Sequence, residues 1–228
     1  MEETMYYIQF LVEDNSTGCL IKVLMDRIIE TNSDVSYDCK AFHGIGGYAK
    51  KSTVQKIKSG KLLNDLPIYL RGFNKSLQNF PAAIFIVLDV DRRNIGLFRN
   101  ELEQIATENK ITVDHVFCIA VEEMEAWLLG DEQAIVAAYP YAKLPIIHAY
   151  DQDSICGTWE ILADAVYPGG LKKLLKENSS QYEIGKQKAS WASNIGLHMN
   201  IRMNRSPSFN YFISALDERI PTMLELGR

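Results

Sequence analysis

A run of apolar residues closed abruptly by acidic residues constrains this chain more than any other feature. Residues 83–88 read AIFIVL, and Asp89 and Asp91 follow directly. A short run rich in Ile, Val and Phe that ends in charge is typical of a strand buried on both faces. Because side chains alternate along a strand, we expect Asp89 and Asp91 to point the same way.

Two neighbouring carboxylates at the end of a buried strand predict a bound cation. Like charges at close range repel each other unless a cation lies between them. A hard divalent ion with oxygen ligands, Mg²⁺ first, is the natural occupant. The alternative is that the acidic turn simply caps a helix that begins near Asn94.

The composition is that of an ordinary globular protein. Of the 228 residues, 47% are hydrophobic and 23% are charged. Apolar runs stay far below the roughly 20 residues of a membrane span, and the acidic start MEET lacks the positive flank of a signal peptide. We therefore expect a cytoplasmic protein that does not enter a membrane.

Cysteine and histidine are too scattered to form an obvious site. The chain has four of each and contains no Cys-x-x-Cys pair: Cys19, Cys39, Cys118 and Cys156, and His43, His115, His148 and His198. This spacing argues against a zinc ribbon, a disulfide framework and a histidine-ligated metal.

Local charge is more informative than the net charge of −5. One basic segment holds Lys50, Lys51, Lys56, Lys58 and Lys61. Acidic residues concentrate at two places, in Asp89 and Asp91 and in Glu122, Glu123 and Glu125. An acidic total can conceal a metal site beside a basic surface that contacts phosphates.

Hydrophobic periodicity predicts strands alternating with helices, and therefore βα units with a mostly parallel sheet of about four strands. We expect strands at residues 5–12, 36–42, 83–88 and 114–121. Helices are expected after a polar turn at 15–18, at 62–77 and at 95–109. After Gly130 the pattern becomes helical, at 155–166, 168–175 and 184–199 and from an N-cap at Ser206. We divide the chain into an α/β core at 1–130 and a helical extension at 131–228 that packs on it as one compact unit.

Acidic residues end three of the expected strands. In a doubly wound sheet the first and third strands are neighbours, and ligands bind beyond their carboxyl ends. Glu13 and Asp89 should then face each other across that crevice. After the fourth strand two readings stay open: Glu123 pairs with Glu125 if the backbone is extended, and Glu122 pairs with Glu125 if a helix has begun.

Lys188 interrupts an apolar stripe on the helix expected at 184–199. At helical spacing it lies with Ile184, Trp191, Ile195 and His198. Such a lysine usually extends to solvent at the edge of an interface. The alternative is a cation directed into the active site, where it stabilises phosphate charge. Lys186 lies on another face of the helix and is expected in solvent.

Two stretches resemble the Toprim domain, the metal-binding α/β module of topoisomerases, primases and OLD-family nucleases: FLVED with Glu13, and VLDVD with Asp89 and Asp91. More closely, the chain resembles a bacterial Toprim-like family related to the RloB-like group and often encoded beside an ABC/OLD-type ATPase. Three further stretches carry that resemblance: EEMEAWLLGD with Glu123 and Glu125, KQKASWASNIGLHM with Lys188, and NRSPSFNYF. This resemblance implies a Toprim-like Rossmannoid fold and a nuclease-like role in defence against phage or foreign DNA.

The sequence thus predicts a nuclease dependent on Mg²⁺ or Mn²⁺ that acts on DNA or RNA. Glu13, Asp89 and Asp91 would hold one ion, and Glu123 and Glu125 would hold a second or orient water. Lys188 would stabilise charge on the phosphate, and the basic segment would contact the nucleic-acid backbone. Two other hypotheses stay open: a non-catalytic partner of an ATPase with a vestigial metal site, and a nucleotide-sugar transferase that uses Asp-x-Asp.

Overall fold

The protein is an α/β structure built on one parallel sheet. The computed structural model describes residues 5–44, 46, 61–178 and 180–220. Its four strands lie in the order β2-β1-β3-β4, and every neighbouring pair is parallel. They are β1 (Tyr6–Val12), β2 (Val35–Ala41), β3 (Ala82–Asp89) and β4 (Asp114–Ala120). The expected fold class, including the pairing of the first strand with the third, is confirmed.

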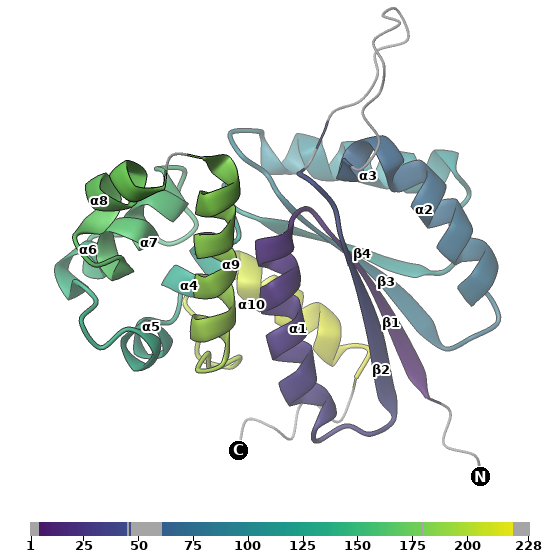
Figure 1. Cartoon of the computed structure of the whole chain (residues 1–228). Coiled ribbons are helices and arrows are strands. Elements are labelled where there is room, and N and C mark those ends of the chain that lie inside the picture. The colour runs from purple at the N-terminus through teal and green to yellow at the C-terminus, as the bar shows by residue number, and fades with distance from the viewer. Residues whose placement is uncertain (1–4, 45, 47–60, 179, 221–228) are drawn as a thin grey trace, which may run out of the picture.

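Helices cover both faces of the sheet and continue beyond it (Figure 1). In the first half these are α1 (Asn15–Ile29), α2 (Leu62–Leu77), α3 (Ile95–Glu108) and α4 (Glu125–Leu129). The rest are α5 (Glu132–Ala138), α6 (Leu144–His148), α7 (Thr158–Val166), α8 (Gly170–Glu177), α9 (Gln181–Gly196) and α10 (Pro207–Asp217). Helices α2 and α3 cover one face, and α1 lies on the other with α9 beside it. No helix in the described ranges is long and apolar enough to cross a membrane.

Strand β3 is the centre of two hydrophobic cores. All eight of its residues are buried, as expected for a continuous apolar strand in a sheet covered on both faces. Phe85 and Val87 face the core that contains α1, whereas Ile84 and Ile86 face α2 and α3. The alternation of side chains along the strand therefore assigns each of them to one of the two cores.

The C-terminal helices share a core with the sheet. Phe212 of α10 contacts the rings of Phe10 and Phe85, and it stacks on Trp127 of α4 with ring centroids 5.2 Å apart. The Trp127 indole N–H donates to Ser208 Oγ at 2.9 Å. Two of the stretches that carried the resemblance, EEMEAWLLGD and NRSPSFNYF, thus pack directly against each other.

Several helices begin or end away from their expected positions because of local capping. Helix α1 starts at Asn15, inside the expected turn, because the Asp14 carboxylate caps it by accepting from Thr17 N at 2.8 Å. Gly157 has a φ of 84°, so α7 begins after it rather than at residue 155. A reciprocal Ser180–Glu183 cap starts α9 at Gln181.

A close backbone approach requires glycine at position 130. Gly130 ends α4, and a Cβ there would lie 1.9 Å from Asn204 Oδ1. The Asn204 amide is buried, donates to Trp127 O at 2.8 Å and accepts from Ser206 N at 2.8 Å. The junction between α4 and the segment before α10 therefore depends on the missing side chain.

We expect Gly130→Ala to lower the free energy of unfolding by about 2–4 kcal/mol, because the methyl group must displace a buried, hydrogen-bonded amide. Urea denaturation measures this loss. The control is Gly72→Ala, since a Cβ at this exposed position of α2 meets nothing within 4 Å. That change should stabilise the helix by about 0.5–1 kcal/mol. Equal effects at the two positions would contradict this account of Gly130.

Candidate metal and acid site

The carboxyl ends of β1 and β3 bring Glu13 and Asp89 together, as expected. The two strands pair in register from Tyr7 with Ala82 to Val12 with Val87. One residue beyond this register, the Glu13 carboxylate accepts a hydrogen bond from the Asp89 backbone N–H, with Oε2 and N 3.0 Å apart. The acidic residues that end the first and third strands therefore lie at one point of the sheet edge.

Asp89 lies in an unfavourable environment for a negative charge. Its residue is 9% exposed. Burial and then the nearby carboxylates of Glu13 and Asp14 raise the pKa of Asp89 well above its usual range, against a smaller lowering by Lys188. Asp14 belongs to this group as well, although no pattern in the sequence had singled it out. Its position directly after Glu13 and its role as the cap of α1 are the signals that could have identified it.

Asp91 does not share the position of Asp89, so the expectation that the two point the same way is wrong. Strand β3 ends at Asp89, and Asp91 lies in a turn with a φ of 51°. Alternation therefore no longer applies to it. Its side chain is 54% exposed and pairs with Arg93 at 3.8 Å. Asp91 instead lines an open hollow of about 500 Å³ that Glu123 also lines.

After β4, Glu123 and Glu125 act together and Glu122 points elsewhere. Glu125 is the first residue of α4 and is 1% exposed. Its Oε1 accepts no hydrogen bond from any residue that the structure describes. Burial raises the pKa of Glu125, and burial together with Glu125, against the opposing effect of Lys188, raises the pKa of Glu123 to about 7. Glu123, rather than Glu122, therefore pairs with Glu125 around Lys188, although the backbone here is a turn and not the extended chain on which that pairing was expected.

Glu122 is an anchor for α7. It has a φ of 58°, which turns its side chain away from the two other glutamates. Its carboxylate accepts from the backbone N–H groups of Cys156, Gly157 and Thr158 at 2.9–3.1 Å, and from the Thr158 hydroxyl. Burial would raise the pKa of Glu122, but these hydrogen bonds outweigh burial and lower it.

We expect Glu122→Gln to destabilise the protein by about 1–2 kcal/mol at pH 7, because an amide accepts these hydrogen bonds more weakly than a carboxylate. The native pKa lies below the ordinary value of 4.5. The stabilisation is therefore present above that value and is lost as the pH falls through the native pKa. Urea denaturation at neutral and at strongly acidic pH measures this loss. Exposed Glu30 supplies the control, Glu30→Gln, and a gap between Glu122→Gln and wild type that does not shrink in acid would contradict the assignment.

Lys188 reaches the acidic residues from α9, as its helical phase allowed. Its ammonium lies 3.3 Å from Glu125 Oε2 and 3.7 Å from Glu123 Oε2, and its side chain is 15% exposed. Burial would lower its pKa, but Glu125, Glu123, Asp89 and Asp14 together raise it, so the lysine stays charged. Lys186 is exposed and lies over the Tyr182 ring, as expected for a residue on another face. His198 follows the end of α9 and is exposed, so its expected place on the buried stripe is wrong.

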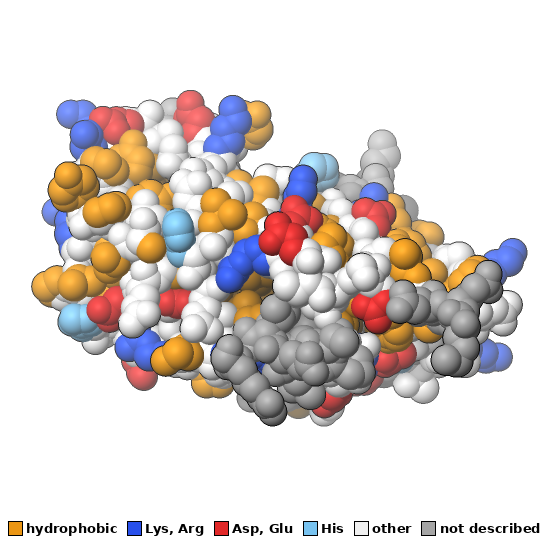
Figure 2. All heavy atoms as spheres, turned by 90° about the horizontal axis from the view of Figure 1, so that it is seen from below, with side chains coloured by type: hydrophobic (Ala, Val, Ile, Leu, Met, Phe, Trp, Pro, Cys, Tyr) orange, Lys and Arg blue, Asp and Glu red, His pale blue; other side chains and the backbone are white. Residues whose placement is uncertain are grey.

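The expected basic segment lies mostly outside the described residues, which include Lys61 but not Lys50, Lys51, Lys56 or Lys58. Lys61 precedes α2, and its ammonium donates to the His43 carbonyl. On the face shown in Figure 2, the described basic and acidic side chains are interspersed. The described part of this face therefore presents no broad basic surface.

The site suits a hard cation in chemistry but is not gathered around one point. Its donors are carboxylate oxygens, including a buried Glu125 oxygen without a hydrogen-bond partner among the described residues, and such oxygens are the ligands of Mg²⁺. Within the described ranges, no three Asp, Glu, His or Cys side chains are grouped closely enough to hold an ion as they stand. In this arrangement the Lys188 ammonium supplies the positive charge that lies between Glu123 and Glu125.

Comparison with known proteins identifies one match. A family model described as "Domain of unknown function (DUF4276)" matches residues 19–217. No curated protein and no solved structure matches the chain. The matched range covers β2 to β4 and all the C-terminal helices, together with Asp89, Glu125 and Lys188.

Proposed function

The chain belongs to the DUF4276 family, and from the chemistry of its acidic site we propose that it is a phosphodiesterase that requires Mg²⁺ or Mn²⁺ and acts on DNA or RNA. The imbalance of charge around Lys188 carries this proposal. One ammonium faces the carboxylates of Glu123 and Glu125 at ion-pair distance, and those of Asp89 and Asp14 lie near enough to raise its pKa. A divalent cation would balance the remaining negative charge.

The strand ends would provide the ligands of that cation. Glu13 and Asp89 lie together where β1 and β3 end, and Asp14 is held beside them by the first turn of α1. When bound, the ion would activate the attacking oxygen and neutralise charge on the phosphate. Asp91 and Glu123 line an open hollow, and the substrate phosphate would approach the ion from there.

Lys188 would have a separate role in charge stabilisation. It is a fixed cation because α9 packs against α1 and carries it into the site, and its raised pKa keeps it protonated at neutral pH. A preorganised ammonium beside a phosphate stabilises the negative charge that develops in the transition state. The basic segment, in which Lys61 is the described member, would contact the nucleic-acid backbone.

A second candidate is a non-catalytic partner of an ABC/OLD-type ATPase, with a vestigial metal site that does not support catalysis. The ion pairs of Lys188 favour it, because they neutralise part of the acidic site without any metal. This candidate predicts ion binding without turnover.

Incubation of the full chain with labelled single-stranded and duplex DNA and RNA, with Mg²⁺ or Mn²⁺ and with EDTA, tests the proposal. We expect metal-dependent cleavage of at least one substrate. Absence of cleavage with every substrate, in Mg²⁺ and in Mn²⁺, would refute it.

A further inference from the structure

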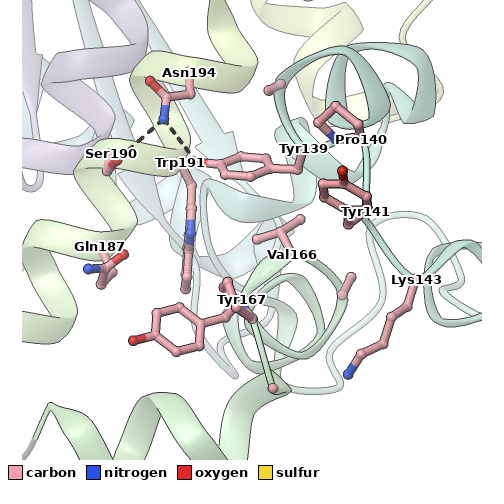
Figure 3. A pocket seen from close by; sticks show the side chains of 14 residues that line it. Tyr139, Pro140, Tyr141, Lys143, Val166, Tyr167, Gln187, Ser190, Trp191 and Asn194 are labelled. Atoms are coloured by element: carbon pink, nitrogen blue, oxygen red, sulfur yellow. Dashed lines mark hydrogen bonds between the residues drawn. The ribbon is translucent and has the colours of Figure 1, made fainter.

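A cavity in the helical part of the chain is separate from the acidic site. Its volume is about 600 Å³, within the range of roughly 300–1,000 Å³ that is typical of small-molecule sites. It lies between α9, the turn after α5 and the turn after α7, and Figure 3 shows it from close by. Its residues belong to neither the sheet edge nor the hollow beside Glu123.

Aromatic rings from three segments meet in this cavity. Trp191 extends from α9 toward the side chains of Tyr139 and Tyr167 (Figure 3) and is 2% exposed, so it lies behind the tyrosines and leaves little of its own ring to a ligand. Tyr141 also lines the cavity and is 97% exposed, so its ring contacts almost nothing else in the described part of the chain. Several rings around one space favour a flat aromatic ligand, because stacking on them removes both faces of the ligand from water.

Amide groups supply polar contacts at the same place. Gln187 and Asn194 line the cavity from α9. The Asn194 amide donates to the Tyr139 hydroxyl at 3.0 Å, whereas no hydrogen bond to a described residue holds the Gln187 amide. A side-chain amide offers a donor and an acceptor side by side, which matches the edge of a purine such as adenine.

A cation lies at the border of the cavity. Lys143 lines it and pairs with Asp164 at 3.3 Å, and both side chains are almost half exposed. An exposed pair of this kind is weak, so the lysine could also contact a phosphate group at the border of the cavity.

We propose that this cavity binds a purine base, supplied by a free nucleotide or by an unpaired base of a single strand. The rings of Tyr139 and Tyr167 would contact the base, with the buried Trp191 behind it, Tyr141 would close over it, and Gln187 would hydrogen-bond its edge. The proposal does not depend on the nuclease activity proposed above. It adds a recognition site on the same helix that carries Lys188.

Titration calorimetry of the full chain in EDTA tests this site without any metal. The probes are adenosine, AMP, ribose 5-phosphate and a short oligo(dA) strand. We expect adenosine and AMP to bind and ribose 5-phosphate, which lacks the base, not to bind. Tighter binding of oligo(dA) than of AMP would identify a strand as the source of the base, and equal or weaker binding would identify a free nucleotide. Failure of all base-containing probes at millimolar concentration, or binding of ribose 5-phosphate as tightly as AMP, would overturn the proposal.

Variants then locate the binding site. Tyr141→Ala should weaken AMP binding roughly tenfold, the scale of losing one stacked ring. It should leave folding unchanged, because the ring is almost fully exposed. Tyr182→Ala is the matched control, since Tyr182 is 70% exposed on the same helical part but does not line the cavity. Equal weakening by both variants would overturn the assignment. Binding by Asp89→Asn as tight as wild type would show that this site stands apart from the acidic site.

Discussion

Replacing Lys188 with Met is expected to lower the free energy of unfolding of the metal-free protein by about 3–5 kcal/mol, because it leaves Glu125 with a buried and uncompensated charge. Glu125 is 1% exposed and lies 3.3 Å from the lysine ammonium. Met keeps most of the packing of the aliphatic stem. The loss of stability therefore measures the effect of removing the positive charge. Urea denaturation in EDTA at neutral pH measures it.

The same variant should recover in acid. Without Lys188 the Glu125 carboxyl has a native pKa still further above the ordinary value of 4.5. A raised carboxyl pKa costs stability above the unfolded pKa, and the cost disappears as the pH falls below it. The double variant Lys188→Met/Glu125→Gln should also regain much of the loss, and Lys186→Met on the solvent side should cost little. A full loss that persists in acid and in the double variant would mean that packing, not charge, is what Lys188 provides.

Replacing Asp89 with Asn is expected to abolish the response of the protein to divalent ions. In EDTA the variant should be at least as stable as wild type, because Asp89 is buried among carboxylates that already raise its pKa. Mg²⁺ or Mn²⁺ should raise the melting temperature of wild type but not of the variant, since an ion that binds the folded state stabilises it. Any nuclease activity should fall by about 100-fold or more, the scale of losing one group that supports the transition state.

The control for this experiment is Asp34→Asn. Asp34 is exposed and precedes β2, at the end of the sheet opposite Asp89. The Asp34→Asn variant should show the same rise in melting temperature with Mg²⁺ or Mn²⁺, and the same activity, as wild type. Equal melting shifts in wild type and Asp89→Asn would remove Asp89 from the ion site.

The fold follows from patterns that act over short distances in the chain. The apolar run before Asp89 is buried on both faces, so its composition alone predicts a central strand. Alternation of such strands with helices allows few topologies, because parallel neighbours need crossover connections of one hand. The meeting of Glu13 with Asp89 follows from that topology. The approach of Lys188 to acidic residues follows from helical phase, since a cation on a buried stripe must meet negative charge or reach solvent.

Tertiary structure decided what lies beyond the ends of these elements. Asp91 and Glu122 both have positive φ values, 51° and 58°. A positive φ at one residue ends the extended geometry of the strand, so its side chain no longer points to the face that alternation predicts. Glu122 then finds its partners at Cys156, Gly157 and Thr158, more than 30 residues away. The cavity around Trp191 likewise joins three segments that share no local pattern. Contacts between distant segments depend on how complete helices pack, and residue periodicity describes only one face of one element at a time.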